Sequence, residues 1–191
     1  MPNTVSVPTP TPDLVREYIE KWKADRNFVL ADACIRDLFS LYPLNTDIRH
    51  ILVKISVINQ LFNTNIFAPI PVAKHIVGLN VDQLFKSESL FVVDKIAEVS
   101  IGEKNRSFYS FATKYAHYHV PNIYAIYDSY VARVITHFGV LNGIRFSRND
   151  LRKYTTYSLT IAWFRGQYGL KEFSVRELDI FLWIFGKQYF P

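Results

Sequence analysis

The chain has 191 residues, of which 49% are hydrophobic and 20% are charged, a composition typical of a globular protein that can bury one core. This excludes a disordered chain, and no run approaches the roughly 18 apolar residues that a membrane helix needs. The single cysteine, Cys34, excludes a disulfide framework, a four-cysteine zinc site and a four-cysteine iron–sulfur cluster. With 22 Lys and Arg against 17 Asp and Glu, the net charge is +5, which favours a polyanionic partner without requiring one.

The amino terminus has neither the basic segment nor the apolar segment of a secretion signal. Together with the lone cysteine, this predicts a cytoplasmic protein. Prolines alternate with threonines from Pro8 to Pro12, so we expect a loose tail over residues 1–10. No linker divides the remainder, and residues 11–191 are expected to form a single helical domain.

The spacing of apolar residues predicts an all-α fold, a compact domain of many helices with short breaks. Thr11 is expected to cap the first helix, with Pro12 at its first position. A second helix is predicted over Ala31–Leu41. A third begins near Asp47, after which isoleucines recur on one helical face.

Shorter helices are expected in the middle of the chain, over residues 72–77 and 81–85. Ser89 and Ser107 are each followed by apolar residues at helical spacing, and both are the type of residue that caps a helix. We therefore expect each of them to cap a further helix.

The carboxy-terminal part has the clearest helix starts. Asp128 precedes a helically spaced apolar stripe. The pairs Ser147 with Asp150 and Ser174 with Glu177 have the form of a capping box. Each of these positions is expected to begin a helix.

Common catalytic and metal-binding motifs are absent from the sequence. It contains no phosphate-binding glycine loop, no dinucleotide fingerprint, no His-Glu-x-x-His and no Gly-x-Ser-x-Gly. His117 and His119 are two residues apart, so a helix directs them to different faces. We therefore expect no metal and no cofactor.

Lys114 and Asp128 are the residues that most strongly suggest chemistry. Lys114 borders an apolar helical stripe, and a lysine partly removed from water loses its proton more readily and becomes a nucleophile. Asp128 lies at a predicted helix start, where backbone N–H groups keep a carboxylate ionised and fixed in direction. From these residues alone, an ordinary amphipathic lysine and an ordinary N-cap are the commoner roles.

Two segments resemble a known family. One is Ser110-Phe111-Ala112-Thr113-Lys114-Tyr115-Ala116 followed by Ile126-Tyr127-Asp128-Ser129-Tyr130-Val131, and the other is Leu52-Val53-Lys54-Ile55-Ser56-Val57-Ile58-Asn59-Gln60. They resemble the core of the helix-hairpin-helix DNA glycosylases, closest to the 8-oxoguanine DNA glycosylase branch. In that family a lysine early in one helix is followed by an aspartate that opens the next, and an upstream Leu-Ser-Gln-Gln-like segment lies beside the target base. The resemblance covers roughly residues 47–138.

The resemblance implies an enzyme that cleaves the N-glycosidic bond of a damaged or modified base flipped out of duplex DNA. Asp128 would stabilise the positive charge that develops on the sugar. Lys114 would attack the anomeric carbon, with possible abasic-site lyase activity. The residues expected to position the base are Asn59, Gln60 and Asn63. Those expected to contact DNA phosphates are Arg145, Arg148, Arg152 and Lys153. We expect the protein to act as a monomer.

The chain departs from the family pattern at two points. Residues 109–113 contain no glycine, whereas the family hairpin has a glycine-rich turn, so an altered hairpin is expected. Only 14 positions separate Lys114 from Asp128, fewer than is usual in the family, so the helix after Lys114 must end early, near His119 and Pro121. The alternative function is a non-catalytic helical DNA-binding or protein-interaction module that keeps the fold without the chemistry. In the enzyme, Lys114 and Asp128 must converge on a cleft.

Overall fold

The computed structural model describes residues 6–191, and over this range the protein is mostly helical. The all-α expectation is therefore correct in class, with one small antiparallel hairpin in addition. The elements in chain order are α1 Pro12–Ala24, α2 Arg26–Leu41, α3 Ile48–Phe62, α4 Pro69–Gly78, α5 Val81–Lys86, α6 Phe91–Ala97, β1 Glu98–Ile101, β2 Lys104–Ser107, α7 Tyr109–His119, α8 Ser129–Leu141, a 3₁₀ turn Asp150–Arg152, α9 Tyr154–Gln167 and α10 Val175–Tyr189.

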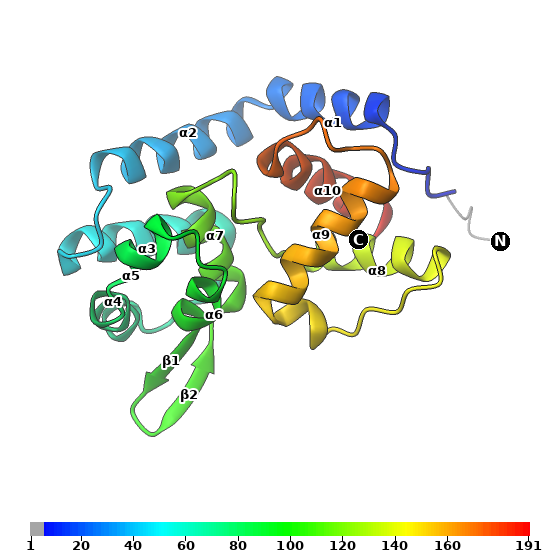
Figure 1. Cartoon of the computed structure of the whole chain (residues 1–191). Coiled ribbons are helices and arrows are strands. Elements are labelled where there is room, and N and C mark those ends of the chain that lie inside the picture. The colour runs from blue at the N-terminus through cyan, green and yellow to red at the C-terminus, as the bar shows by residue number, and fades with distance from the viewer. Residues whose placement is uncertain (1–5) are drawn as a thin grey trace.

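The helices form two groups that lie side by side, and α1 and α2 run along the top of both in the view of Figure 1. On one side, α7 packs against α2, α3 and α6, and α4 lies against α3. On the other side, α10 packs against α1 and α8, and α9 also contacts α8. Helices α1 and α2 follow each other across both groups (Figure 1). None of the helices within residues 6–191 is both long and apolar enough to cross a bilayer.

Helix α7 is surrounded by protein on every face. Tyr109 and all residues from Phe111 to Tyr118 are buried, whereas Ser110 and His119 are half-buried. The sequence pattern indicated one apolar face, but aromatic and small residues around the whole circumference allow α7 to pack on all sides. Lys114 and His117 are therefore carried into the interior on this helix.

The β-hairpin was not expected from the sequence. Strands β1 and β2 pair antiparallel, with Glu98 opposite Ser107 and Ile101 opposite Lys104. Gly102 in the turn has φ 60°, a value that two-residue hairpin turns favour and that glycine adopts without strain. All four residues of β2 are exposed, so β2 has no apolar alternation by which to recognise it, and only the four residues of β1 alternate, with Val99 buried.

Two of the expected caps are wrong. Ser107 ends β2, and Phe108 precedes α7 without a side-chain hydrogen bond. Ser89 does not cap α6 either, because the residue at that position is Leu90, which makes no capping bond. Helix α6 follows a turn in which Val92 N–H donates to the Ser89 carbonyl instead.

Four predicted helix starts are confirmed. The side chains of Thr11, Asp47 and Asp128 accept hydrogen bonds from backbone N–H groups of α1, α3 and α8. Ser174 forms the complete capping box with Glu177. In these cases a short polar side chain precedes a long apolar stripe, so local chemistry and burial favour the same boundary.

Other boundaries differ from the expectation. Helix α2 begins at Arg26 under an Asp25 cap, five residues before the predicted start at Ala31. Helix α4 begins at Pro69, because a proline in the first helical turn loses no intrahelical hydrogen bond. At the other end of the chain, residues 1–5 of the expected tail lie outside the described residues. Residues 6–10 have no regular structure, yet Pro10 is buried and Val7 packs partly against the core.

The expected helix at Ser147 is only a single 3₁₀ turn. Ser147 and Asp150 exchange the reciprocal hydrogen bonds of a capping box, but α9 starts four residues later, at Tyr154. There the carboxylate of Asp94 in α6 accepts from Tyr154 N–H at 3.1 Å. A distant side chain thus supplies the cap for α9, and burial raises the pKa of this carboxyl.

Helices α8 and α10 cross in close contact at Gly186. A Cβ atom at this position would lie 2.8 Å from Tyr130 Cβ and 3.0 Å from the Tyr130 carbonyl oxygen. Glycine therefore permits the approach that brings α10 beside the start of α8, next to Asp128.

We predict that Gly186→Ala lowers the free energy of unfolding by about 1–3 kcal/mol, because the backbone of α8 must shift. Gly166→Ala is the matched control. Gly166 is exposed in α9, and its Cβ would meet only Lys171 Cε at 3.9 Å, so the change should raise stability by up to about 1 kcal/mol. Urea denaturation of both variants measures the difference, and equal effects would contradict the close crossing.

Candidate functional site

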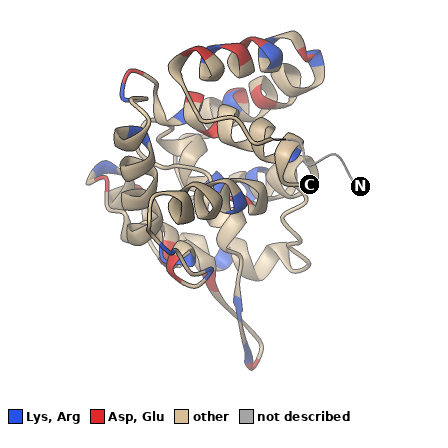
Figure 2. Ribbon diagram, turned by 90° about the vertical axis from the view of Figure 1, so that its right-hand side faces the viewer, with Lys and Arg blue, Asp and Glu red and all other residues tan. Residues whose placement is uncertain are grey.

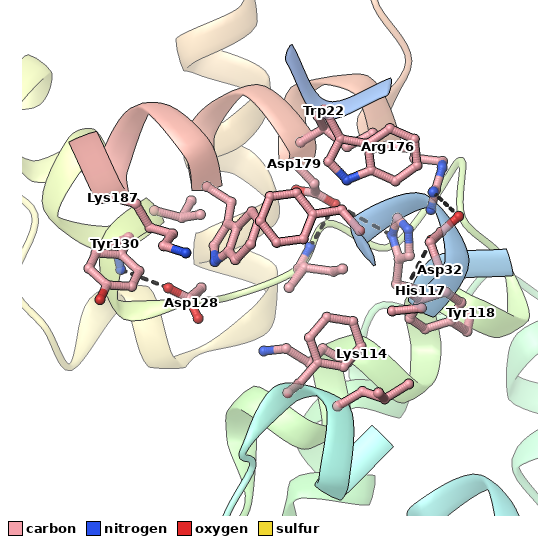
Figure 3. A pocket seen from close by; sticks show the side chains of 18 of the residues that line it. Trp22, Asp32, Lys114, His117, Tyr118, Asp128, Tyr130, Arg176, Asp179 and Lys187 are labelled. Carbon is pink, nitrogen blue, oxygen red and sulfur yellow. Dashed lines mark hydrogen bonds and ion pairs between the residues drawn. The ribbon is translucent and has the colours of Figure 1, made fainter. Parts of the chain in front are cut away.

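A cavity of about 400 Å³ lies between the two groups of helices (Figure 3). Its walls come from α1, α2, the end of α3, α7, the connection before α8, the start of α8, and α10. The lining residues are Trp22, Phe28, Ala31, Asp32, Leu61, Phe62, Asn63, Lys114, His117, Tyr118, Ile126, Asp128, Tyr130, Val131, Arg176, Asp179, Ile180, Trp183 and Lys187.

Lys114 is the buried amine of this cavity. Its side chain is 3% exposed, and its Nζ donates to Ser110 Oγ at 2.7 Å and to the Tyr127 carbonyl at 3.5 Å. Burial lowers the pKa of Lys114 to about 8, and the nearby acidic side chains, Asp128 first, act in the opposite direction. A substantial fraction of the amine is therefore neutral near physiological pH, as a nucleophile requires.

Asp128 lines the same cavity and also caps α8. Its Oδ1 accepts from Tyr130 N–H at 2.9 Å, and its side chain is half-buried. Figure 3 shows Lys114 extending its amine toward the side of the cavity on which Asp128 lies. Within residues 6–191 the two groups form no direct ion pair, so the carboxylate retains acceptor capacity on its cavity side.

His117 and Asp179 are buried at another part of the wall (Figure 3). His117 Nδ1 lies 2.7 Å from the Tyr124 carbonyl and 3.4 Å from Asp179 Oδ2. Asp179 Oδ2 also accepts from Ile126 N–H at 3.0 Å. Burial lowers the pKa of His117 to about 4 and raises the pKa of Asp179 well above its usual range. His117 is thus neutral at physiological pH, and burial disfavours the charged form of Asp179.

Asp32 and Arg176 join α2 to α10 at the same end of the cavity (Figure 3). The Asp32 carboxylate pairs with Arg176 and Arg36 and also accepts from the Tyr118 hydroxyl at 3.1 Å. The two guanidinium groups outweigh burial and lower the pKa of Asp32. This ion-pair network fixes the position of α10 relative to α2.

Aromatic side chains form much of the remaining wall. Phe28 and Trp183 meet edge to face with ring centroids 4.9 Å apart, and Lys114 Nζ lies 5.5 Å from the centroid of the Phe62 ring. Trp22 lies under the Arg176 guanidinium at 5.6 Å. A cavity with flat apolar walls and a few polar groups suits a planar ring.

A second buried lysine shows that burial alone does not make a site. Lys54 is fully buried, and burial lowers its pKa to about 8. Its Nζ donates to Asn45 Oδ1 at 3.0 Å and to the Leu44 carbonyl at 3.2 Å, and it does not line the cavity. Lys54 ties the α2–α3 connection to the core, whereas Lys114 faces a space that a ligand can enter.

The three residues expected to position a base are separated by the fold. Asn59 lies in α3 and is bonded to the loop that follows this helix, where it accepts from Ile66 N–H at 2.8 Å and from the Thr64 hydroxyl at 3.0 Å. Gln60 is exposed away from the cavity. Asn63 lines the cavity in a left-handed conformation with φ 49°. Only Asn63 therefore lies where it can meet a ligand with Lys114 and Asp128.

The four residues expected to contact phosphates are all exposed and lie on or near the α8–α9 connection. They are Arg145, Arg148, Arg152 and Lys153. Arg148 also lines a second hollow of about 530 Å³ with Arg133 and His137 of α8. Elsewhere, Figure 2 shows charges of both signs along the helices at the top of the molecule and on the hairpin at the bottom.

Comparison with known proteins places the chain in a family. Residues 14–123 match the HI_0787_N family, which is described as an N-terminal domain. The chain is also 40% identical over 154 residues to an uncharacterized protein of Haemophilus influenzae, an alignment covering 79% of this chain and 74% of the relative. The chain belongs to the HI_0787_N family. No solved structure matches it.

The family match contains only part of the cavity. It includes Lys114 and His117, and it ends at Ile123, before Asp128, Arg176 and Asp179. The residues that complete the cavity therefore come from the part of the chain that follows the matched domain.

Sequence reasoning missed Asp32, His117, Arg176 and Asp179 as cavity residues. A signal was present in Asp179, since Leu178, Phe181 and Leu182 place it on the apolar face of α10. A carboxylate on a buried helical face needs a specific partner or a changed protonation state. His117 was considered only as a metal ligand, and Arg176 lies between the two capping-box residues Ser174 and Glu177 without a pattern of its own.

Proposed function

We propose that the protein is a DNA glycosylase-like enzyme that cleaves the N-glycosidic bond of a modified or damaged base flipped out of duplex DNA. One observation carries the proposal: Lys114 and Asp128, which the sequence singles out 14 positions apart, line one cavity. The proposal includes action as a cytoplasmic monomer without a cofactor.

The chemistry follows from the two side chains. The neutral Lys114 amine attacks the anomeric carbon of the sugar, the bond from this carbon to the base breaks, and the base leaves with the bonding electrons and takes up a proton. Asp128 stabilises the positive charge that develops on the sugar as this bond weakens. Loss of a proton from the attached nitrogen and opening of the sugar ring give a Schiff base. Elimination of the 3′ phosphate from this intermediate would cleave the strand.

The rest of the cavity suits the base that such a reaction releases. Extrusion of a base from the stack costs a few kcal/mol, and aromatic walls such as Phe62 and Trp183 can recover part of it by stacking. The exposed arginines and lysine of the α8–α9 connection would hold the DNA backbone.

One observation favours the alternative, a non-catalytic DNA-binding or protein-interaction module. The segment directly before α7 is the β1–β2 hairpin, and no glycine follows Gly102 until Gly139. A glycine-rich helical hairpin for gripping a DNA phosphate is therefore not available there. Measurements of base excision and of covalent adduct trapping decide between the two functions.

Asp128→Asn should lower excision by about a hundredfold or more, because the uncharged amide cannot stabilise the sugar cation, whereas asparagine caps α8 as well as aspartate does. The measurement is the release of abasic sites from a panel of duplexes that each contain one modified base. Full excision by Asp128→Asn at an unchanged melting temperature would contradict the mechanism.

Borohydride should trap a covalent protein–DNA adduct with the wild-type protein and not with Lys114→Gln, which removes the nucleophile and keeps much of the apolar stem. Lys187→Gln is the matched control, because Lys187 lines the same cavity but is exposed, and its loss should leave trapping intact. Excision without trapping would make Lys114 a positioning residue and the enzyme monofunctional. Trapping that depends on Lys187 would transfer the nucleophile to that residue.

Affinity for duplex DNA should fall steeply with salt, because bound phosphates release counterions. Arg148→Glu with Arg152→Glu should weaken binding at least about tenfold. Lys74→Glu with Lys86→Glu changes the net charge equally at exposed positions on α4 and α5 and should weaken it much less. An equal loss in both double variants would show that net charge, and not this surface, determines affinity.

A further inference from the structure

Two buried polar atoms of the cavity wall have no hydrogen-bond partner among the described residues. They are Nε2 of His117 and Oδ1 of Asp179. The side chains are 1% and 7% exposed, and both line the cavity. His117 Nδ1 lies 3.4 Å from Asp179 Oδ2. The two unpartnered atoms are therefore the second nitrogen and the second oxygen of side chains that already contact each other. Leaving such atoms unpaired is costly, so they point to a ligand.

The surroundings of His117 fix the role of its free nitrogen. The Tyr124 carbonyl, 2.7 Å from Nδ1, can only accept a hydrogen bond, so Nδ1 carries the proton. Burial keeps the ring neutral by lowering its pKa to about 4. Nε2 is therefore a hydrogen-bond acceptor.

The surroundings of Asp179 fix the role of its free oxygen in the same way. Oδ2 accepts from Ile126 N–H at 3.0 Å and faces the N–H of His117. Burial raises the pKa of this carboxyl, against the opposing effects of Arg176 and Lys114. Because Oδ2 already faces two N–H donors, the neutral form of Asp179 carries its proton on Oδ1, which is then a hydrogen-bond donor.

We propose that His117 and Asp179, both in their neutral forms, make a reading edge in the cavity that selects a planar ring with a lactam edge, one ring N–H beside one carbonyl. The N–H donates to His117 Nε2, and the carbonyl accepts from Asp179 Oδ1. This inference deepens the proposed function and rests on it in one respect: the ring is taken to be the flipped base.

Counting hydrogen atoms separates the lactam edge from the amidine edge of adenine or cytosine. An exocyclic amino group brings two N–H donors, and the reading edge offers one free acceptor, so one buried N–H is left unpaired. A lactam N–H has one hydrogen and leaves only a carbonyl lone pair unused, which proteins tolerate better. Hypoxanthine and adenine differ in this feature and little else, as do uracil and cytosine.

The first experiment measures binding of the free bases to the full-length protein. The indole N–H signals in the NMR spectrum provide the readout, because Trp22 and Trp183 line the cavity and Trp163 does not. Hypoxanthine and uracil should shift the signals of Trp22 and Trp183 with at least about tenfold higher affinity than adenine and cytosine, and Trp163 should not respond. Equal affinity within each pair, a preference for the amino bases, or no shift at the cavity tryptophans would overturn the proposal.

Variants test the two atoms separately. His117→Asn retains an amide N–H for the Tyr124 carbonyl and removes the acceptor at Nε2, so the preference for hypoxanthine over adenine should disappear. Asp179→Leu should weaken the binding of hypoxanthine and of adenine, because each loses the hydrogen bond from Oδ1, and Asp179→Asn, whose amide can accept from Ile126 and donate into the cavity, should restore it. An unchanged preference in folded His117→Asn would overturn the proposal even if Asp179→Leu fails to fold.

Failure of this inference can be told apart from failure of the proposed function. Lactam-selective binding without excision from any duplex would refute the glycosylase and leave the reading edge in place. Excision at equal rates from duplexes with hypoxanthine and with adenine would refute the reading edge and leave the glycosylase in place.

Discussion

The burial of α7 on all of its faces is the constraint on which the candidate site depends. A helix at the surface would leave Lys114 and His117 in water with ordinary protonation states. In this protein the helices packed around α7 exclude water from both side chains. The lysine amine and the histidine imidazole then favour their uncharged forms. One packing feature thus gives a neutral imidazole and an amine that is readily deprotonated, eight-tenths of a helical turn apart by the ~100° step per residue.

The cavity is built from both parts of the chain. Helix α7 belongs to the region that matches the HI_0787_N family, and Asp128, Arg176 and Asp179 follow it in sequence. The close crossing of α8 and α10 at Gly186 and the Asp32–Arg176 ion pair hold these later residues against α7. The site therefore requires the two groups of helices to pack together, and a fragment limited to residues 14–123 lacks half of it.

Local sequence chemistry predicted part of this arrangement. Asp128 could be found because an N-cap is a short-range feature, fixed by the residue and the apolar stripe after it. Lys114 could be singled out because it borders an apolar stripe. The early end of α7 at His119 also agrees with the short interval from Lys114 to Asp128. The resemblance to helix-hairpin-helix glycosylases stays a prediction.

Long-range contacts could not be predicted in this way. Asp94 caps α9 from 60 residues away, and Asp179 meets Ile126 N–H from 53 residues away, so neither contact leaves a local pattern. Asn59 resembled a ligand-binding residue because the sequence gives its helical face but not its hydrogen bonds to the loop that follows. The hairpin was missed because β2 is exposed throughout and carries no apolar alternation, and the four residues of β1 are too short a pattern to indicate a strand alone.

The direct test of this account is the titration of the Lys114 amine. Protein labelled with ¹³C at the lysine ε-carbons gives one NMR signal per lysine, and the signal absent from Lys114→Gln belongs to Lys114. The account predicts that this signal titrates with a pKa of about 8. A pKa at the ordinary lysine value of about 10.4 would mean that the amine is solvated and charged at physiological pH, and would contradict Lys114 as the nucleophile.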